Sequence, residues 1–333
     1  MNRKWIHGLL LALGLLCLVL MLRAVGVGKV WHTLASLGWG LVPLVLIEGL
    51  GEALHTNGWR RCLSGPVGSQ SSFVRLFWVR MAGYAINYFT PTAALGGEVT
   101  RITLIAPVGR TAEATSTVLI DKACMALAHL LLVMVGAYLV LWRIQLSPVL
   151  RTTLLISGAV MAAGIVAFML IQKHGRLGVA LRWPLVRRLV SGKVTDNVDA
   201  VDEAFRAFYR DRRPDLAIAV FWHMGGYAAS LLQTWLFFIL LGKHPGFVVV
   251  TAVWVIGLWF DLLVFLVPMS VGTLEGSRIV TLTAIGYRAI EGMTLGMVVR
   301  LGQWSWAVIG LIAYAVMAFN SRAISPAPAP SKL

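Results

Sequence analysis

The sequence predicts an all-α polytopic membrane protein: a helical bundle of about six to eight spans, with two Pro/Gly-broken re-entrant elements that form an inverted repeat. Three observations predict this. Of the 333 residues, 58% are hydrophobic and only 13% are charged, which is more apolar than a soluble chain of this size can bury. The apolar residues fall into runs long enough to cross a bilayer. Two of these runs are interrupted by the same pattern of Pro, Gly, Glu and Arg.

The uninterrupted apolar runs define the predicted spans in order. They cover residues 5–22, 39–58, 116–142, 152–171, 216–241 and 294–319. A basic start precedes the first run, as in a signal peptide, but no A-x-A-like cleavage site follows, so a retained span is expected. The regions 73–106 and 247–287 are the interrupted ones, and each is predicted to be a hairpin of half-helices. If each region instead crossed the membrane twice, the number of crossings would stay even and the predicted side of both termini would not change.

This order divides the chain into two membrane halves and a linker. The predicted divisions are a first half, 1–171, with its break at 87–101; a linker, 172–215; a second half, 216–320, with its break at 268–278; and a disordered, Pro-rich tail, 321–333. In the linker, Val198, Val201, Phe205 and Phe208 recur at helical spacing opposite charged residues, which predicts an amphipathic surface helix over 196–212.

The charge distribution indicates orientation and lipid contact. The chain has 29 Lys and Arg residues against 14 Asp and Glu residues, and the basic residues fall mainly between the apolar runs. This placement favours contact with anionic lipids over a nucleic-acid partner. The linker carries ten Lys and Arg residues, which predicts that it is cytoplasmic. Counting spans outward then places both termini in the cytoplasm, in a multi-pass protein of the plasma (inner) membrane.

The two interruptions share one motif. Pro91 is followed by Glu98 and then Arg101, and Pro268 is followed at the same spacing by Glu275 and Arg278. Ionised side chains are costly inside a membrane, so their repetition at Pro/Gly breaks in both halves points to a site near the midplane.

The chemistry at these breaks favours phosphate binding. The N-terminus of a half-helix offers free N–H groups, Arg side chains would clamp the phosphate, and glycines would let a headgroup approach the backbone. The predicted substrate-binding residues are Arg80, Asn87, Gly96, Gly97, Glu98, Arg101, Gly272, Glu275 and Arg278. A structural pair between Arg101 and Glu98 is the alternative.

A second set of polar residues predicts a proton or headgroup relay. Glu48, Glu52 and His55 form one stripe along a single predicted helix. The full predicted relay comprises Glu48, Glu52, His55, Asp121 and Asp261. The alternative is that these carboxylates pair with Arg side chains or backbone donors within the bundle.

No catalytic residue, metal site or cofactor is predicted. The sequence contains no Gly-x-Ser-x-Gly, P-loop or His-Glu-x-x-His motif. The three cysteines, Cys17, Cys62 and Cys124, have no CxxC spacing and no His at ligand spacing.

The order of these residues resembles a known family, the flippase-like transmembrane family. The residues that carry the resemblance are Trp59, Arg60, Arg80, Asn87, Pro91, Gly96, Gly97, Glu98, Arg101, Asp121, Pro268, Gly272, Glu275, Gly276 and Arg300. The family includes the membrane region of lysylphosphatidylglycerol synthases and hopanoid-cluster-associated membrane proteins. The resemblance implies movement of a lipid headgroup between leaflets. Since the chain ends after the membrane region, synthesis of a lysyl-lipid is not expected.

Two functional hypotheses follow. The first is a flippase-like lipid translocase for an anionic phospholipid or a polyprenyl-phosphate lipid, with membrane lipids as its partners. The second is a membrane enzyme, or an accessory subunit of a lipid-modifying enzyme, acting on a lipid-linked intermediate in envelope lipid or glycan synthesis, with the same carboxylates as general acid and base.

Overall fold

Helices make up all the regular secondary structure that the computed structural model describes. The described residues are 16–63, 67–68, 71–90, 96–106, 110–143, 147–174, 176, 179, 198–263 and 268–324. No strand occurs in these ranges. The all-α fold class expected from the composition is confirmed.

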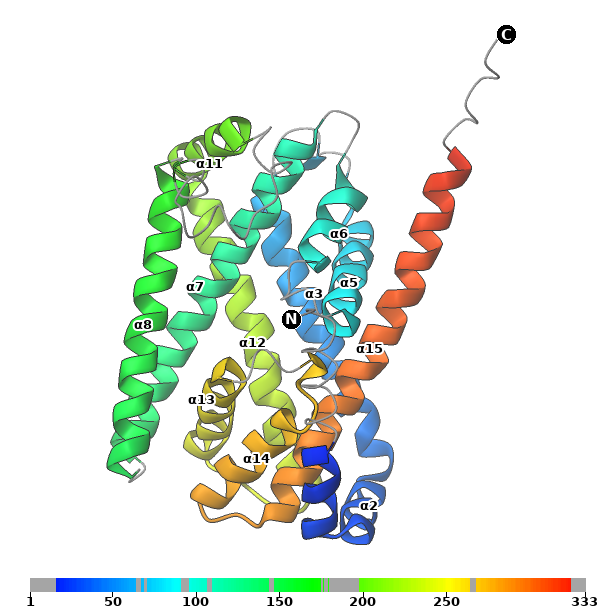
Figure 1. Cartoon of the computed structure of the whole chain (residues 1–333), viewed down its shortest axis with the longest axis vertical. Coiled ribbons are helices and arrows are strands. Elements are labelled where there is room, and N and C mark those ends of the chain that lie inside the picture. Colours follow the sequence, from blue (N-terminus) through cyan, green and yellow to red (C-terminus); the bar gives the residue numbers. More distant parts are fainter. Residues whose placement is uncertain are drawn as a thin grey trace, which may run out of the picture.

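Five long helices run along the bundle (Figure 1). They are α3 (Leu41–Cys62), α7 (Thr111–Arg143), α8 (Pro148–Lys173), α12 (Arg213–Leu240) and α15 (Ala289–Ile324). Among the described residues, α7, α8 and α15 are each long and apolar enough to cross a membrane, and one bent pair would make a fourth span. α3 and α12 are also long but carry inward-facing polar side chains. The number of described helices that are apolar enough to count as membrane spans is therefore smaller than the predicted six to eight.

Each of the two interrupted regions forms a pair of shorter helices. α5 (Phe73–Phe89) packs against α6 (Gly96–Ile105), and α13 (Phe247–Leu263) packs against α14 (Thr273–Ala284). α6 and α14 have 10 and 12 residues, so at roughly 1.5 Å per residue they reach about half-way through a hydrocarbon core of about 30 Å. The two pairs open towards opposite ends of the bundle (Figure 1). α6 and α14 are thus each too short to cross such a core alone, as half-helices would be.

The N-terminal part of the described chain is a bent pair of helices. The helix Leu16–Val25 and α2 (Val27–Ser36) meet at 80°. Gly26 lies at the bend with φ 100°, a conformation that glycine adopts without a steric penalty. The predicted first span, 5–22, therefore overlaps the described residues only in part, and its start lies outside them.

The predicted amphipathic helix is present as α11 (Val198–Asp211). It lies at one end of the bundle and contacts α7, α8 and α12 (Figure 1). Val201, Phe205 and Phe208 are buried against the bundle, and Tyr209 donates a hydrogen bond to Gln172 at the end of α8 at 2.8 Å. The apolar face of α11 thus packs on protein. Of the predicted tail, residues up to 324 continue α15, and 325–333 lie outside the described residues.

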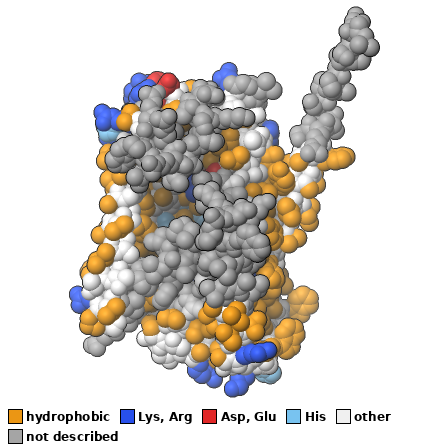
Figure 2. Space-filling view, in the orientation of Figure 1, with side chains coloured by type: hydrophobic (Ala, Val, Ile, Leu, Met, Phe, Trp, Pro, Cys, Tyr) orange, Lys and Arg blue, Asp and Glu red, His pale blue; other side chains and the backbone are white. Residues whose placement is uncertain are grey.

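The surface fits a membrane environment. Figure 2 shows hydrophobic side chains along the sides of the bundle and Lys and Arg side chains towards its two ends. Exposed large apolar residues include Val160 on α8, Tyr138 on α7 and Ile312 on α15. Contiguous exposed apolar surface of this kind is stable when it faces lipid.

Glycine brings the two helices of the first hairpin into close contact. A Cβ on Gly97 of α6 would lie 2.2 Å from the carbonyl oxygen of Gly83 on α5, and 2.4 Å from the Asn87 side chain. Gly97 was predicted to let a lipid headgroup approach the backbone. In the structure its bare backbone accommodates α5 instead.

The first prediction tests this contact. Gly97→Ala should destabilise the protein by about 1–3 kcal/mol, because the added methyl group overlaps a backbone carbonyl that cannot move aside. Gly158→Ala is the matched control, since a Cβ on Gly158 of α8 meets nothing within 4 Å. It should be neutral, or stabilising by about 0.5–1 kcal/mol. Thermal unfolding in detergent measures both. Equal melting temperatures for the two variants would contradict the close α5–α6 contact.

Candidate functional site

Glycines also allow α3 and α12 to approach each other. A Cβ on Gly51 would lie 3.2 Å from the carbonyl oxygen of Gly226, and a Cβ on Gly58 would lie 2.6 Å from the His223 ring. A Cβ on Gly226 would similarly lie 2.6 Å from the His55 ring. These contacts let two imidazoles from facing helices meet inside the bundle.

The carboxylate of Asp121, on α7, is the centre of a buried charged cluster. Its side chain is fully buried. Arg101 of α6 donates to Oδ2 through Nη2 at 2.6 Å, and Arg80 of α5 approaches the same oxygen through Nη1 at 3.5 Å. Nε2 of His223, on α12, lies 3.0 Å from Oδ1. Four helices therefore converge on one carboxylate.

The charges of this cluster balance. Arg80 also donates through Nε to Oε2 of Glu52, on α3, at 2.6 Å. The guanidinium of Arg101 lies over the ring of Trp59 at 3.9 Å from its centroid, a cation–π contact. Two carboxylates thus face two guanidinium groups, which is the condition under which buried charges are tolerated. Glu52, Arg80, Arg101, Asp121, His55 and His223 are called the buried array below.

The two histidines extend the array towards α3. Nδ1 of His55 lies 2.9 Å from Nδ1 of His223, so one ring donates and the other accepts. When Nε2 of neutral His223 carries the proton, its Nδ1 is an acceptor, and Nδ1 of His55 is then the donor. Two imidazoles linked in this way can pass a proton between α3 and α12, beside the Asp121 carboxylate, whose Oδ1 lies 3.0 Å from His223 Nε2 without a hydrogen bond.

At the first break, where α5 ends and α6 begins, the amide side chain of Asn87 links the two helices. Asn87, near the end of α5, accepts from the backbone N–H of Gly97 at 2.6 Å and donates to Oε2 of Glu98 at 3.2 Å. The other oxygen of Glu98 pairs with Nζ of Lys122 at 2.6 Å. The Lys122 side chain is 44% exposed, so this ion pair lies at an accessible edge of the bundle.

The second break is held by a guanidinium group. Arg300 of α15 pairs through Nε and Nη2 with the Glu275 carboxylate and donates to the carbonyl oxygens of Met269 and Ser270 at 3.1 and 3.0 Å. Glu275 also accepts from the backbone N–H of Gly272 at 3.1 Å. Met269 and Ser270 have positive φ angles of 56° and 48°, which are unfavourable for residues with a Cβ. The Arg300 contacts stabilise this strained turn.

The two breaks touch each other. α5 contacts the short 3₁₀ turn η3 (Pro268–Ser270) that precedes α14. Tyr88, in the last turn of α5, lies close enough to interact electrostatically with Arg300 and Glu275. The end of α5 and the turn before α14 therefore lie side by side inside the bundle.

The sequence-predicted residues fall into three groups. Arg80, Arg101, Glu52, His55 and Asp121 lie together in the buried array. Asn87, Gly96, Gly97 and Glu98 form the first break, and Gly272 and Glu275 form the second. Glu48 contacts Tyr84 electrostatically and makes no hydrogen bond or ion pair with another described residue. Arg278 donates to Ser277 at 3.1 Å and lies against Gly257 of α13. Asp261 belongs to α13, and its side chain is not among those described.

The structure changes two of the predicted pairings. Arg80 and Arg101 were expected to clamp phosphate; in the structure Arg80 pairs with Glu52 and Asp121, and Arg101 pairs with Asp121. The alternative pair between Arg101 and Glu98 is replaced by Arg101 with Asp121 and Glu98 with Lys122. Helix geometry explains this, because Arg101 and Glu98 lie one turn apart on α6 and meet residues at different depths of α7, Asp121 and the partly exposed Lys122.

Three residues with clear roles were missing from the predicted sites. Lys122 pairs with Glu98, His223 completes the array, and Arg300 holds the second break. Each is a polar residue within an apolar run, and this pattern could have identified it as a site residue from the sequence. In the part of the chain that the structure describes, no group of three or more His, Cys, Asp or Glu side chains could hold a metal ion.

The second prediction tests the buried array. Arg101→Leu alone leaves Asp121 with one charge partner fewer and should cost about 3–5 kcal/mol of stability. The double variant Arg101→Leu with Asp121→Asn keeps the remaining Arg80–Glu52 pair neutral and should recover most of that loss. Combining Arg101→Leu with Glu98→Gln should not recover it, since Glu98 pairs with Lys122. Thermal unfolding of the three variants gives the comparison, and rescue by the Glu98 change instead would overturn the assigned pairing.

Comparisons with known proteins identify a family and a relative. The family described as the lysylphosphatidylglycerol synthase TM region matches residues 5–312. The chain is 26% identical over 290 residues to a UPF0104 membrane protein of Methanothermobacter thermautotrophicus, and the match covers 80% of each chain. No solved structure matches the chain.

Proposed function

Because the chain belongs to the lysylphosphatidylglycerol synthase transmembrane-region family, we propose that this membrane protein is a flippase-like translocase of a phosphate-bearing lipid. The substrate would be an anionic phospholipid or a polyprenyl-phosphate lipid. The observation that carries the proposal is the contact between α5 and η3, where two half-helix hairpins from opposite ends of the bundle meet. Transporters bind substrate at such meeting points of broken helices, since either end can open around a fixed site.

The headgroup would bind at the first break. Lys122 is only partly buried and has one carboxylate partner, so two of its three ammonium donors remain for an arriving phosphate. The N-terminus of α6, which begins at Gly96 and is capped by Asn87, presents the positive end of its helix dipole. Glu98 competes with the phosphate for Lys122. An ion pair that exchanges partners in this way would hold the headgroup without trapping it.

The buried array would serve as frame and proton path. Its Arg side chains are already paired, so it would keep α5, α6 and α7 in register during translocation. His55 and His223 lie beside Asp121, and they are the groups through which proton movement would be coupled to lipid movement.

We place the protein in the plasma membrane with both termini in the cytoplasm. The basic linker, 172–215, supports this orientation, and α11 and the end of α15 lie at the same end of the bundle (Figure 1). A C-terminal epitope tag should be digested by protease only after the cells are opened. Digestion in intact cells would reverse the orientation.

The test of function uses purified protein in liposomes with a fluorescent, head-intact phosphatidylglycerol. Lys122→Gln should slow its movement between leaflets by about 10- to 150-fold, the effect of losing a charge-assisted contact. Lys243→Gln is the matched control. It breaks a similar pair, with Glu291 at 2.5 Å and a Lys side chain 36% exposed, between the start of α15 and the loop after α12. It should leave the rate unchanged.

Three results would contradict the proposal. Equal rates for Lys122→Gln and the unaltered protein would remove the headgroup site from the first break. Equal slowing by both Lys variants would mean that general destabilisation is responsible. An altered lipid in the mass spectrum, without movement between leaflets, would favour the membrane-enzyme hypothesis.

A further inference from the structure

The C-terminal half of α15 separates from the bundle. α15 crosses α5 very closely at Gly310, where a Cβ would lie 2.2 Å from the carbonyl oxygen of Met81 and 3.2 Å from the Cβ of Ala85. Beyond this crossing, α15 tilts outwards, and its end stands apart from the neighbouring helices (Figure 1). The start of α5 and the end of α15 therefore form the two walls of a groove.

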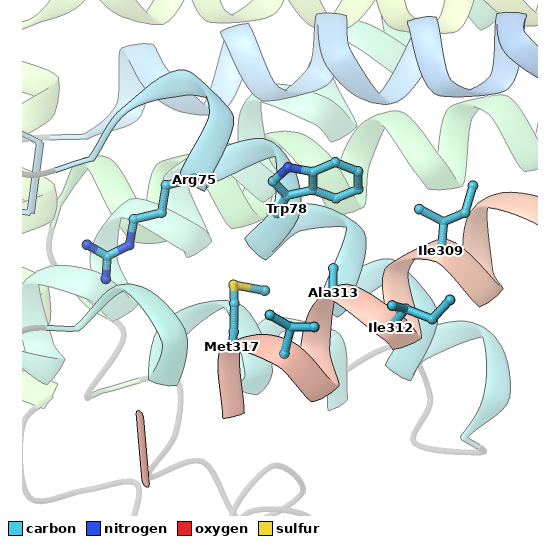
Figure 3. A pocket seen from close by; sticks show the side chains of 7 residues that line it. Arg75, Trp78, Ile309, Ile312, Ala313 and Met317 are labelled. Carbon is cyan, nitrogen blue, oxygen red and sulfur yellow. The ribbon is translucent and has the colours of Figure 1, made fainter. Parts of the chain in front are cut away.

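This groove is apolar and of ligand size. One face of α15 lines it with Ile309, Ile312, Ala313, Val316 and Met317, and α5 contributes Trp78 and Arg75 (Figure 3). Its volume is about 450 Å³, within the range of about 300–1,000 Å³ that is typical of small-molecule sites. Ile312 and Val316 are 59% and 53% exposed, so the groove is open to the surrounding lipid.

A single charge marks one end of the groove. Arg75, in the first turn of α5, lies beside Met317 at the outer end of the wall formed by α15 (Figure 3). Its Nη2 donates to the carbonyl oxygen of Leu104 at 3.3 Å, which fixes the guanidinium at the base of the α5–α6 hairpin. Arg75 forms no ion pair with a described residue, and its remaining donors are available to an anion.

We propose that this groove binds one anionic phospholipid. An acyl chain lies along Ile309–Met317, Trp78 packs beside it, and the phosphate group binds Arg75. An Arg at the end of an apolar groove is complementary to a lipid in both charge and shape, because the guanidinium fork matches phosphate and the apolar wall matches the acyl chain. The site is separate from the first break and does not depend on translocation.

The arrangement of charge favours a lipid over a second copy of the chain. A protein helix in the groove would have to cover Arg75 and supply a carboxylate opposite it, and burying that ion pair is costly. A phospholipid brings its phosphate to the interface without that cost.

Native mass spectrometry of the purified full chain tests the site, with phosphatidylglycerol and phosphatidylcholine added in equal amounts. One phosphatidylglycerol per chain should remain bound in preference to phosphatidylcholine. Arg75→Gln should weaken its binding by about 10- to 100-fold. Ala313→Trp should abolish it by filling the groove.

Two matched variants control for charge and bulk. Arg151→Gln removes an exposed Arg from α8, and Val160→Trp adds bulk to an exposed position on the same helix. Both should retain the lipid. Equal melting temperatures of Arg75→Gln and Arg151→Gln would separate lost binding from lost folding. Equal binding of phosphatidylglycerol and phosphatidylcholine would overturn the proposal. So would dimers of the chain that disappear with Ala313→Trp. Both outcomes hold whether or not the protein moves lipid in liposomes.

Discussion

The buried carboxylate of Asp121 is the constraint on which the first half of the structure depends. A fully buried carboxylate is stable only when cations and donors surround it. Arg101 reaches it because α6 starts again half-way through the bundle, and Arg80 reaches it from the middle of α5. His223 reaches it because glycines let α12 approach α3. The break in the first hairpin and the close α3–α12 contact are thus geometric conditions for satisfying one charge.

The two breaks are stabilised by different chemistry despite their shared motif. At the first, the Asn87 amide caps α6 and orients Glu98, leaving the other carboxylate oxygen for Lys122. At the second, Arg300 binds Glu275 through two nitrogens and also holds two strained carbonyl groups. A planar guanidinium that makes four contacts is hard to displace, whereas a single flexible Lys exchanges partners readily. The second break is therefore the more rigid one, and the first is the more open to a ligand.

Much of the fold was predictable from the sequence because Pro, Gly and intramembrane charge are strong local signals. The half-helices, their inverted placement and α11 follow from hydropathy and spacing. Pairings between helices did not follow. Arg101 and Glu98 are three residues apart and looked like partners, but the neighbours that decide their contacts, Asp121 and Lys122, come from α7. His223 was indistinguishable from an ordinary helix-contact residue until α3 and α12 were placed side by side.

The charge balance of the array has an electrical consequence. A membrane potential acts on each unit charge with about 2.3 kcal/mol per 100 mV across the full membrane. With both imidazoles neutral, the two carboxylates and two guanidinium groups sum to zero, so the field exerts no net force on the array. Displacing α3, α5, α6 and α7 together would be electrically silent. Voltage would then act on the lipid headgroup and on any proton it travels with, and the protein itself would carry no gating charge from these residues.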